Sequence, residues 1–210
     1  MTTLGFYQKL AGQKRLTTRA AAQLAGVSIP AASMALRRLA KEGLSTPLKK
    51  GTWLLGAPSA KSGALVTAAA DPYLAYLSGW SALRLHDRIQ QIPQTHFAVT
   101  LGRPGEMATP AGRIALHRVK PELFGGYTYD SRVEGFVASP ETALFDLAYL
   151  TAMNRSRVSG SLPETDLKGL RWKEVQTWLR RIPTPHVRAA VEQALATIRQ
   201  RHTGSPSQMD

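Results

Sequence analysis

Two polar side chains four residues apart, Ser33 and Arg37, have the types and the spacing needed to hydrogen-bond the base edges of DNA. Four residues make about one turn of an α-helix, so both side chains lie on the same helix face. An arginine in this position can bond bidentately to O6 and N7 of a guanine. Arg38 and Lys41 stand nearer the end of the same segment, where contact with backbone phosphates is expected.

Residues on either side extend this predicted contact set. Thr17 and Thr18 stand at a helix start and can offer hydroxyl and backbone N–H donors to phosphate. Lys49 and Lys50 form a tight turn that suits a neighbouring groove or the backbone. Small apolar side chains can contact a thymine methyl group. The alternative for each residue is an ordinary solvated surface position. The full predicted set is Thr17, Thr18, Arg19, Ser28, Ala31, Ser33, Met34, Arg37, Arg38, Lys41, Lys49 and Lys50.

The spacing of caps and apolar residues predicts the helices that carry this set. Phe6 and Leu10 mark one face of a first short helix. A second helix begins at Thr17 or Thr18 and ends at Gly26, where the chain must turn. Ser28 caps a third helix that ends at Gly43. The spacings of three and four predict that this helix buries one face, made by Ile29, Ala32, Leu36 and Leu39.

Two short apolar runs follow, one from Leu44 to Leu48 and one from Trp53 to Leu55. The Lys49–Gly51 turn between them predicts a β-hairpin, with Trp53 in its core rather than serving as a stacking platform for a base. Helix, helix, turn, helix and hairpin is the order of a winged helix-turn-helix, whose third helix lies in the major groove.

The charge distribution favours a polyanionic partner. The 210 residues carry a net charge of +13, and residues 1–67 hold ten basic residues and one acid, a net +9. Lysine and arginine that neutralise phosphates release counterions, which drives binding to DNA. The sequence has no cysteine, no long apolar stretch and no secretory signal, so we expect a cytoplasmic protein without disulfides, thiolate metal sites or membrane spans.

No catalytic or metal-binding pattern accompanies these features, so we predict no catalytic residue, no metal and no cofactor. His96 and His117 stand in two expected strands, and a site shared between them stays open as an alternative to structural histidines. Asp146 is expected to pair with a basic residue rather than act as a base. The other candidates considered are His86, Asp87, Asp130 and Glu141.

The chain divides into an α+β arrangement of an N-terminal winged helix-turn-helix at 1–57, a linker at 58–70, a mixed domain with C-terminal helices at 71–202 and a disordered tail at 203–210. In the mixed domain a helix is expected from Asp71-Pro72 and another from Ser139. Strands are expected at 95–101, 114–119, 126–129 and 133–137, and amphipathic helices at 170–181 and 185–201. These last two helices either pack on the domain or form a dimerisation or partner surface.

Three runs in the second part carry a resemblance: YLSGWSALRLH at 76–86, QIPQT at 91–95 and ASPETALFDLAYL at 138–150. They resemble the AbiEi family, the antitoxins of type IV toxin–antitoxin systems, over about residues 5–152. The resemblance implies a winged helix joined to an antitoxin domain. It also implies repression of the protein's own promoter through inverted repeats, with a homodimer or cooperative binding on DNA. It further implies action against a nucleotidyltransferase-like toxin without a stable complex.

Two other functions stay open. One is a stand-alone regulator whose second domain senses a ligand or a protein. The other is an enzyme with an appended DNA-binding domain, which would need a polar cleft joining His96 or His117 to carboxylates.

Overall fold

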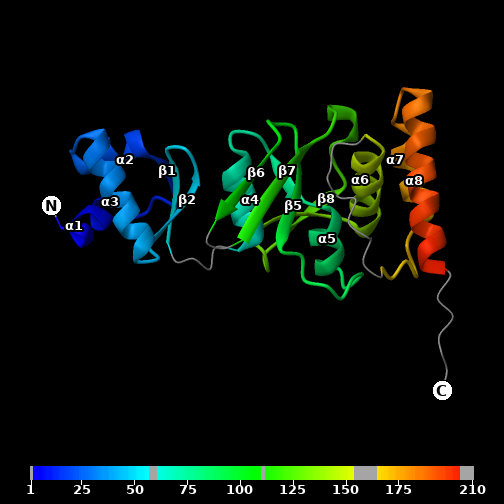
Figure 1. Cartoon of the computed structure of the whole chain (residues 1–210), viewed down its shortest axis with the longest axis horizontal. Coiled ribbons are helices and arrows are strands. Elements are labelled where there is room, and N and C mark those ends of the chain that lie inside the picture. The colour runs from blue at the N-terminus through cyan, green and yellow to red at the C-terminus, as the bar shows by residue number, and fades with distance from the viewer. Residues whose placement is uncertain (1, 57–60, 110–111, 154–164, 204–210) are drawn as a thin grey trace, which may run out of the picture.

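The computed structural model describes residues 2–56, 61–109, 112–153 and 165–203, apart from the side chains of Lys49 and of residues 201–203. Within these ranges the chain forms eight α-helices and two β-sheets, so the predicted mixed α+β class is confirmed. Figure 1 shows the smaller sheet with α1, α2 and α3 at one end of the molecule, the larger sheet in the middle, and α6, α7 and α8 at the other end. We call residues 2–56 the first body and residues 61–203 the second body.

Side-chain caps define the helices of the first body. Thr17 Oγ1 accepts a hydrogen bond from Ala20 N, and Ser28 Oγ accepts one from Ala31 N, as the sequence predicts. Gly26 ends the second helix with φ +68°, a left-handed conformation that favours glycine. The helices are α1 (Thr3–Lys9), α2 (Thr18–Ala25) and α3 (Ile29–Lys41).

The sheet of the first body is antiparallel, with the order β1-β3-β2. The hairpin of β2 (Ser45–Lys49) and β3 (Thr52–Leu55) agrees with the sequence, whereas β1 (Arg15–Thr17) was not predicted. Leu16 of β1 stands opposite Trp53 of β3, and both belong to the core that the three helices cover.

One residue of the predicted buried face of α3 is an exception. Ala32, Leu36 and Leu39 are fully buried, but Ile29 is 47% exposed. Ile29 lies in the first turn of α3, beside the α2–α3 turn, and lines an open cleft there. Helical periodicity does not predict the exposure of Ile29. It indicates which residues share a helix face, but not whether another element packs against that face at the end of the helix.

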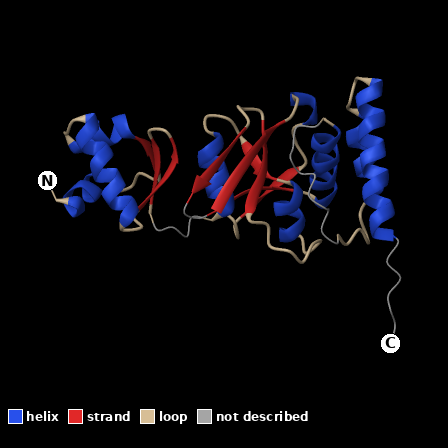
Figure 2. Cartoon of the chain, in the orientation of Figure 1, coloured by secondary structure: helices blue, strands red, loops and turns tan. Residues whose placement is uncertain are grey.

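The second body is built on a six-stranded mixed sheet, with the order β6-β7-β5-β4-β9-β8. Figure 2 shows the strands of this sheet in red and the helices around it in blue. The β5–β7 and β4–β9 pairs are parallel, and the other neighbours are antiparallel. The strands are β4 (Ala75–Leu77), β5 (Thr95–Thr100), β6 (Gly105–Thr109), β7 (Gly112–Arg118), β8 (Tyr127–Asp130) and β9 (Gly135–Ala138).

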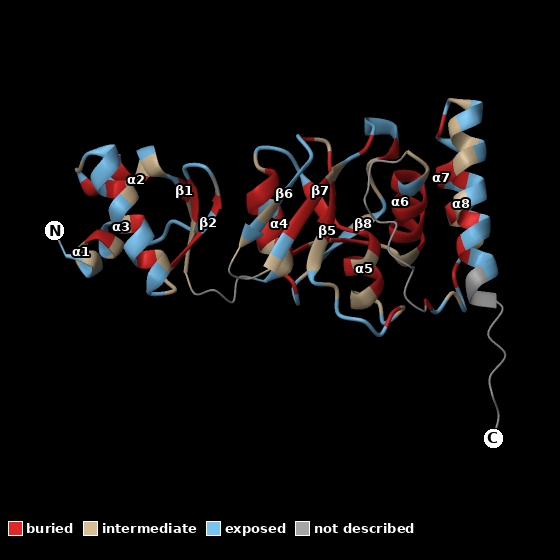
Figure 3. Cartoon of the chain, viewed as in Figure 1, coloured by how far each residue is buried: buried red, intermediate tan, exposed pale blue. Residues whose placement is uncertain are grey.

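Helix α6 is the centre of this body, because every residue from Glu141 to Leu150 is buried (Figure 3). Helices α7 and α8 both pack on α6. Of the two roles that the sequence left open for these amphipathic helices, the structure shows packing on the domain. Helix α4 packs on β4 and β9, and α5 on β5 and α6. The helices are α4 (Ser62–Ala70), α5 (Gly79–Leu85), α6 (Pro140–Ala152), α7 (Trp172–Arg180) and α8 (Pro185–Thr203), with a short 3₁₀ turn at Pro121–Leu123.

The start of the second body differs from the prediction. The linker expected at 58–70 contains the buried helix α4 from residue 62 onward, because its small apolar residues pack instead of remaining flexible. The helix expected from Asp71-Pro72 is wrong, since residues 75–77 form the fully buried strand β4 and α5 begins only at Gly79. Residues 57–60 of the expected linker and 204–210 of the expected disordered tail lie outside the described residues.

Replacing Gly63 by alanine should destabilise the second body by about 1–3 kcal/mol. A Cβ atom at Gly63 would lie 2.7 Å from Cα of Gly135 and 2.7 Å from the carbonyl oxygen of Val133, so backbone would have to move where α4 meets β9. Gly105→Ala is the matched control, because a Cβ there meets nothing within 4 Å. Urea unfolding measures both variants, and equal midpoints for the two would contradict this account of the contact.

Candidate nucleic-acid interface

The buried face of α3 fixes which side of the helix points to solvent. Ala32, Leu36 and Leu39 have no exposed surface. In addition, Ser45 Oγ donates a 2.9 Å hydrogen bond to the carbonyl oxygen of Leu36 in a buried position. Helix α3 is therefore held both by its apolar side chains and by a bond to β2, so its rotation about its own axis is fixed.

The opposite side of α3 carries most of the predicted contact set. Ala31, Arg37, Arg38 and Lys41 are exposed, and so is Met34 at 57% (Figure 3). Ser33, one turn before Arg37, is partly buried. Arg38 and Lys41 lie in the last turn of the helix. The structure thus brings apolar, hydroxyl and cationic groups together on one open helix face.

The start of α2 is tied to the tip of the hairpin. Trp53 Nε1 donates to Thr18 Oγ1 over 2.9 Å, and the backbone N–H of Thr18 donates to Gly51 O over 2.9 Å. The hydroxyl of Thr18 is therefore engaged within the protein, as is that of Thr17, which caps α2. Arg19 is exposed beside them.

The hairpin tip places Lys50 in an exposed position, next to Gly51 with its φ of +75°. Lys49 is the last residue of β2, and its side chain lies outside the described part of the chain. The backbone bond from Thr18 to Gly51 holds the tip close to the start of α2, so two of the predicted phosphate-contacting regions are neighbours.

A shallow open cleft lies at the turn between α2 and α3. The sequence analysis did not single out Gln23 or Val27, which help to line it. Gln23 lies in α2, and the packing of α3 against α2 forms the cleft beside it, whereas Val27 directly precedes Ser28 in the turn between the two helices. The cleft is lined by Arg19, Ala22, Gln23, Gly26, Val27, Ser28 and Ile29.

The site shared by His96 and His117, left open by the sequence, does not form. His96 pairs in register with Ile114, three residues before His117 on β7, so the two histidines point to opposite faces of the sheet. His117 stacks on Phe97 with ring centroids 4.2 Å apart. Burial lowers the pKa of His117 to about 4, and the charge of Glu106 opposes this. His117 is thus a neutral packing residue, and its buried Nε2 atom has no hydrogen-bond partner among the described residues.

Asp146 is held by hydroxyl groups rather than by the basic partner expected from the sequence. The hydroxyl of Ser78 donates to Asp146 Oδ2 over 2.6 Å and that of Tyr76 over 3.1 Å, while Oδ1 has no partner in the part of the chain that the structure describes. The residue is completely buried, and this burial raises its pKa to about 7 against the lowering effect of both hydroxyls. The group joins β4 to α6 and has no exposed surface through which a substrate could reach it.

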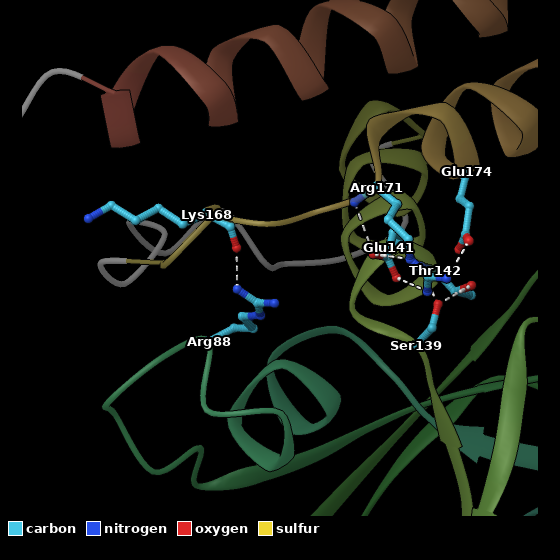
Figure 4. Close-up of polar contacts among 7 residues, drawn as sticks. All are labelled: Arg88, Ser139, Glu141, Thr142, Lys168, Arg171 and Glu174. Atoms are coloured by element: carbon cyan, nitrogen blue, oxygen red, sulfur yellow. Dashed lines mark hydrogen bonds and ion pairs between the residues drawn. The ribbon is translucent and has the colours of Figure 1, made fainter.

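A second polar cluster fastens α7 to the start of α6 (Figure 4). The backbone N–H and the guanidinium of Arg171 donate to the carboxylate of Glu141, which is 3% exposed. Arg171 also forms a 2.7 Å ion pair with Glu174. Burial acts to raise the pKa of Glu141, but the hydrogen bonds from Arg171 outweigh it and leave the pKa below its ordinary value. These contacts connect α7 to α6, and they pair the charge of Arg171 with those of Glu141 and Glu174.

Two comparisons with known proteins found no match. No protein-family model matches the sequence, and no curated protein matches it significantly. Within the described ranges, no helix is long and apolar enough to cross a lipid bilayer. The same residues contain no cluster of three or more histidine and carboxylate side chains placed to hold a metal ion.

Replacing Asp146 by asparagine should change how stability depends on pH. The raised pKa means that the folded state keeps a proton that the unfolded state has released, so this group's contribution to stability is present below pH 3.8 and is lost as pH rises towards about 7. The loss amounts to on the order of 4 kcal/mol at high pH. Urea unfolding across this range should show that Asp146→Asn gains stability over the native chain as pH rises.

His117→Gln serves as the comparison with the opposite sign. Because the pKa of His117 is lowered, the native histidine adds stability as pH rises from about 4 to 6.5, and the variant lacks that gain. A stability difference between Asp146→Asn and the native chain that stays constant with pH would show that the carboxyl has the same pKa in the folded and unfolded states, which contradicts the raised pKa.

Proposed function

We propose that the protein is a DNA-binding transcriptional regulator whose first body is a winged helix-turn-helix. The observation that carries the proposal is the orientation of α3, which buries Ala32, Leu36 and Leu39 and leaves Arg37, Arg38 and the other groups of that face in solvent. In a winged helix the third helix reads the major groove and the hairpin reaches the neighbouring backbone.

The groups on this face divide into base-reading and phosphate-binding roles. Arg37 lies in the middle of the exposed face, where a bidentate contact with guanine requires it, and Met34 can contact a thymine methyl group. Arg38, Lys41 and Lys50 are exposed cations at the helix end and the hairpin tip, which suits phosphates. The net charge of +9 over residues 1–67 supports the same partner.

The resemblance of the second body to the AbiEi family extends the proposal. The regulator would act in the cytoplasm on inverted repeats of its own promoter, as a homodimer or by cooperative binding, and would counteract a nucleotidyltransferase-like toxin encoded beside it. The support is the three sequence runs at 76–86, 91–95 and 138–150, which supply parts of β4, α5, β5 and α6.

Arg37→Ala should reduce discrimination between promoter DNA and random DNA by about 1–3 kcal/mol, because one bidentate base contact is lost. Binding is measured by gel shift on the region upstream of the protein's own gene and on a random duplex of the same length, at two salt concentrations. Arg180→Ala, an exposed arginine on α7, is the matched control for the loss of one positive charge.

The native chain is expected to prefer the upstream region, and Arg180→Ala should keep that preference. Equal affinity of the native chain for both duplexes would contradict sequence-specific regulation. Equal discrimination by Arg37→Ala and the native chain would remove Arg37 from base reading.

Co-expression tests the antitoxin part separately. If a neighbouring gene encodes a nucleotidyltransferase that stops growth when expressed alone, growth should recover when this chain is produced with it from an unrelated promoter. Since the promoter is unrelated, recovery would not arise from repression of the toxin gene. Continued arrest would count against antitoxin activity and leave the stand-alone regulator.

A further inference from the structure

The small sheet of the first body has two faces, and each packs on a different core. Leu16 and Trp53 point towards α1, α2 and α3. Leu54, the next residue on β3, packs instead against the core of the second body. The sheet therefore lies between the two cores, and in Figure 1 β2 lies nearer the second body than β1 does.

Leu48 makes the deepest of these contacts. It belongs to β2 of the first body, yet its side chain is 3% exposed and is part of the core cluster of the second body. Strand β2 lies against the edge strand β6 and against α4. Leu48 comes two residues before Lys50, so the anchor is next to the hairpin tip.

The pairing of β2 with β3 is irregular at this same point. Pro47 stands opposite Trp53 and Lys49 opposite Thr52, which leaves Leu48 without a partner in the register. A bulge of this kind bends the strand and increases its local twist. The direction of the tip thus depends on how Leu48 is held.

An ion pair supports the contact from the neighbouring strand. Arg15 and Leu54 are paired in register, and Arg15 Nη2 lies 2.5 Å from Asp71 Oδ2, just after α4. On the opposite side, the bonds of Thr18 with Gly51 and Trp53 tie the hairpin to α2. The hairpin is therefore held on one side by α2 of the first body and on the other side by the second body.

We propose that Leu48 is a positioning residue through which the second body sets the direction of the hairpin tip on DNA. The proposal rests on the proposed function, because the tip matters only if Lys50 reaches a phosphate. The second body then takes part in DNA binding without touching DNA at this point. If the packing of Leu48 is weakened, the hairpin tip should lose its contact with phosphate while α3 still contacts the bases.

Leu48→Ala in the full chain is the first test. Hydrogen exchange of the hairpin amides at 45–55, without DNA, should become about tenfold faster as the local opening free energy falls. On a random duplex, the slope of log affinity against log salt should fall by about one, as for Lys50→Ala. Ile198→Ala on α8, similarly buried in the same core, is the matched control and should change neither measurement. Leu48→Met should restore both.

Asp71→Asn is a second variant that leaves the core intact. Charge alone would make it bind DNA more tightly, because it removes a negative group, whereas loss of the Arg15 contact predicts faster hairpin exchange and no gain in affinity. Unchanged exchange in both Leu48→Ala and Asp71→Asn would overturn the positioning role. A native chain that binds no duplex would contradict the proposed function, and hairpin exchange would then still decide whether Leu48 anchors the tip.

Discussion

The interaction on which the first body depends is the burial of three side chains of α3 against α1, α2 and the small sheet. Ala32, Leu36 and Leu39 leave no freedom for α3 to rotate, because any rotation would expose a leucine and bury a cation. Transfer of a leucine side chain to water costs about 1.5–3 kcal/mol, and burial of an unpaired arginine costs more. The direction of Arg37 is thus fixed by residues that are themselves buried.

The small sheet transmits this constraint to the rest of the molecule. The hydrogen bond from Ser45 to Leu36 holds α3, and the hydrogen bonds of Thr18 with Trp53 and Gly51 hold α2. On the other face of the sheet, Leu48 and Leu54 pack on the core of the second body. In the second body the buried polar groups Asp146 and Glu141 are occupied in joining strands and helices to α6. These two carboxyl groups therefore serve the scaffold, whereas Arg37, Arg38 and Lys41 of α3 are exposed to solvent.

Local signals made much of the first body predictable. Thr17, Gly26 and Ser28 act as the caps and the turn that their types indicate, because capping depends only on residues within one helical turn. The hairpin of β2 and β3 also follows from the glycine turn between them. By contrast, strand β1 is only three residues long and forms by pairing with β3. No pattern within its own residues indicates this pairing.

The second body was less predictable for the same physical reason. Strand β4 reads Ala75-Tyr-Leu and is buried on both faces, so it lacks the alternation that marks a half-exposed strand, and its apolar residues fit a helix equally well. The depth of Asp146 and the contact of Leu48 with the second core depend on segments that are distant in the sequence. Sequence pattern indicated the face of α3 but not the cleft beside it, since the cleft forms only where α3 packs against α2.

Hydrogen exchange of the full chain with and without a DNA duplex tests the central claim most directly. Backbone amides of α3 and of the hairpin tip around Lys50 should become protected when the duplex is added, while amides at the exposed surface of α8 should not change. Protection confined to the second body, or no protection of α3 at a duplex concentration that shifts the protein in a gel, would contradict the account.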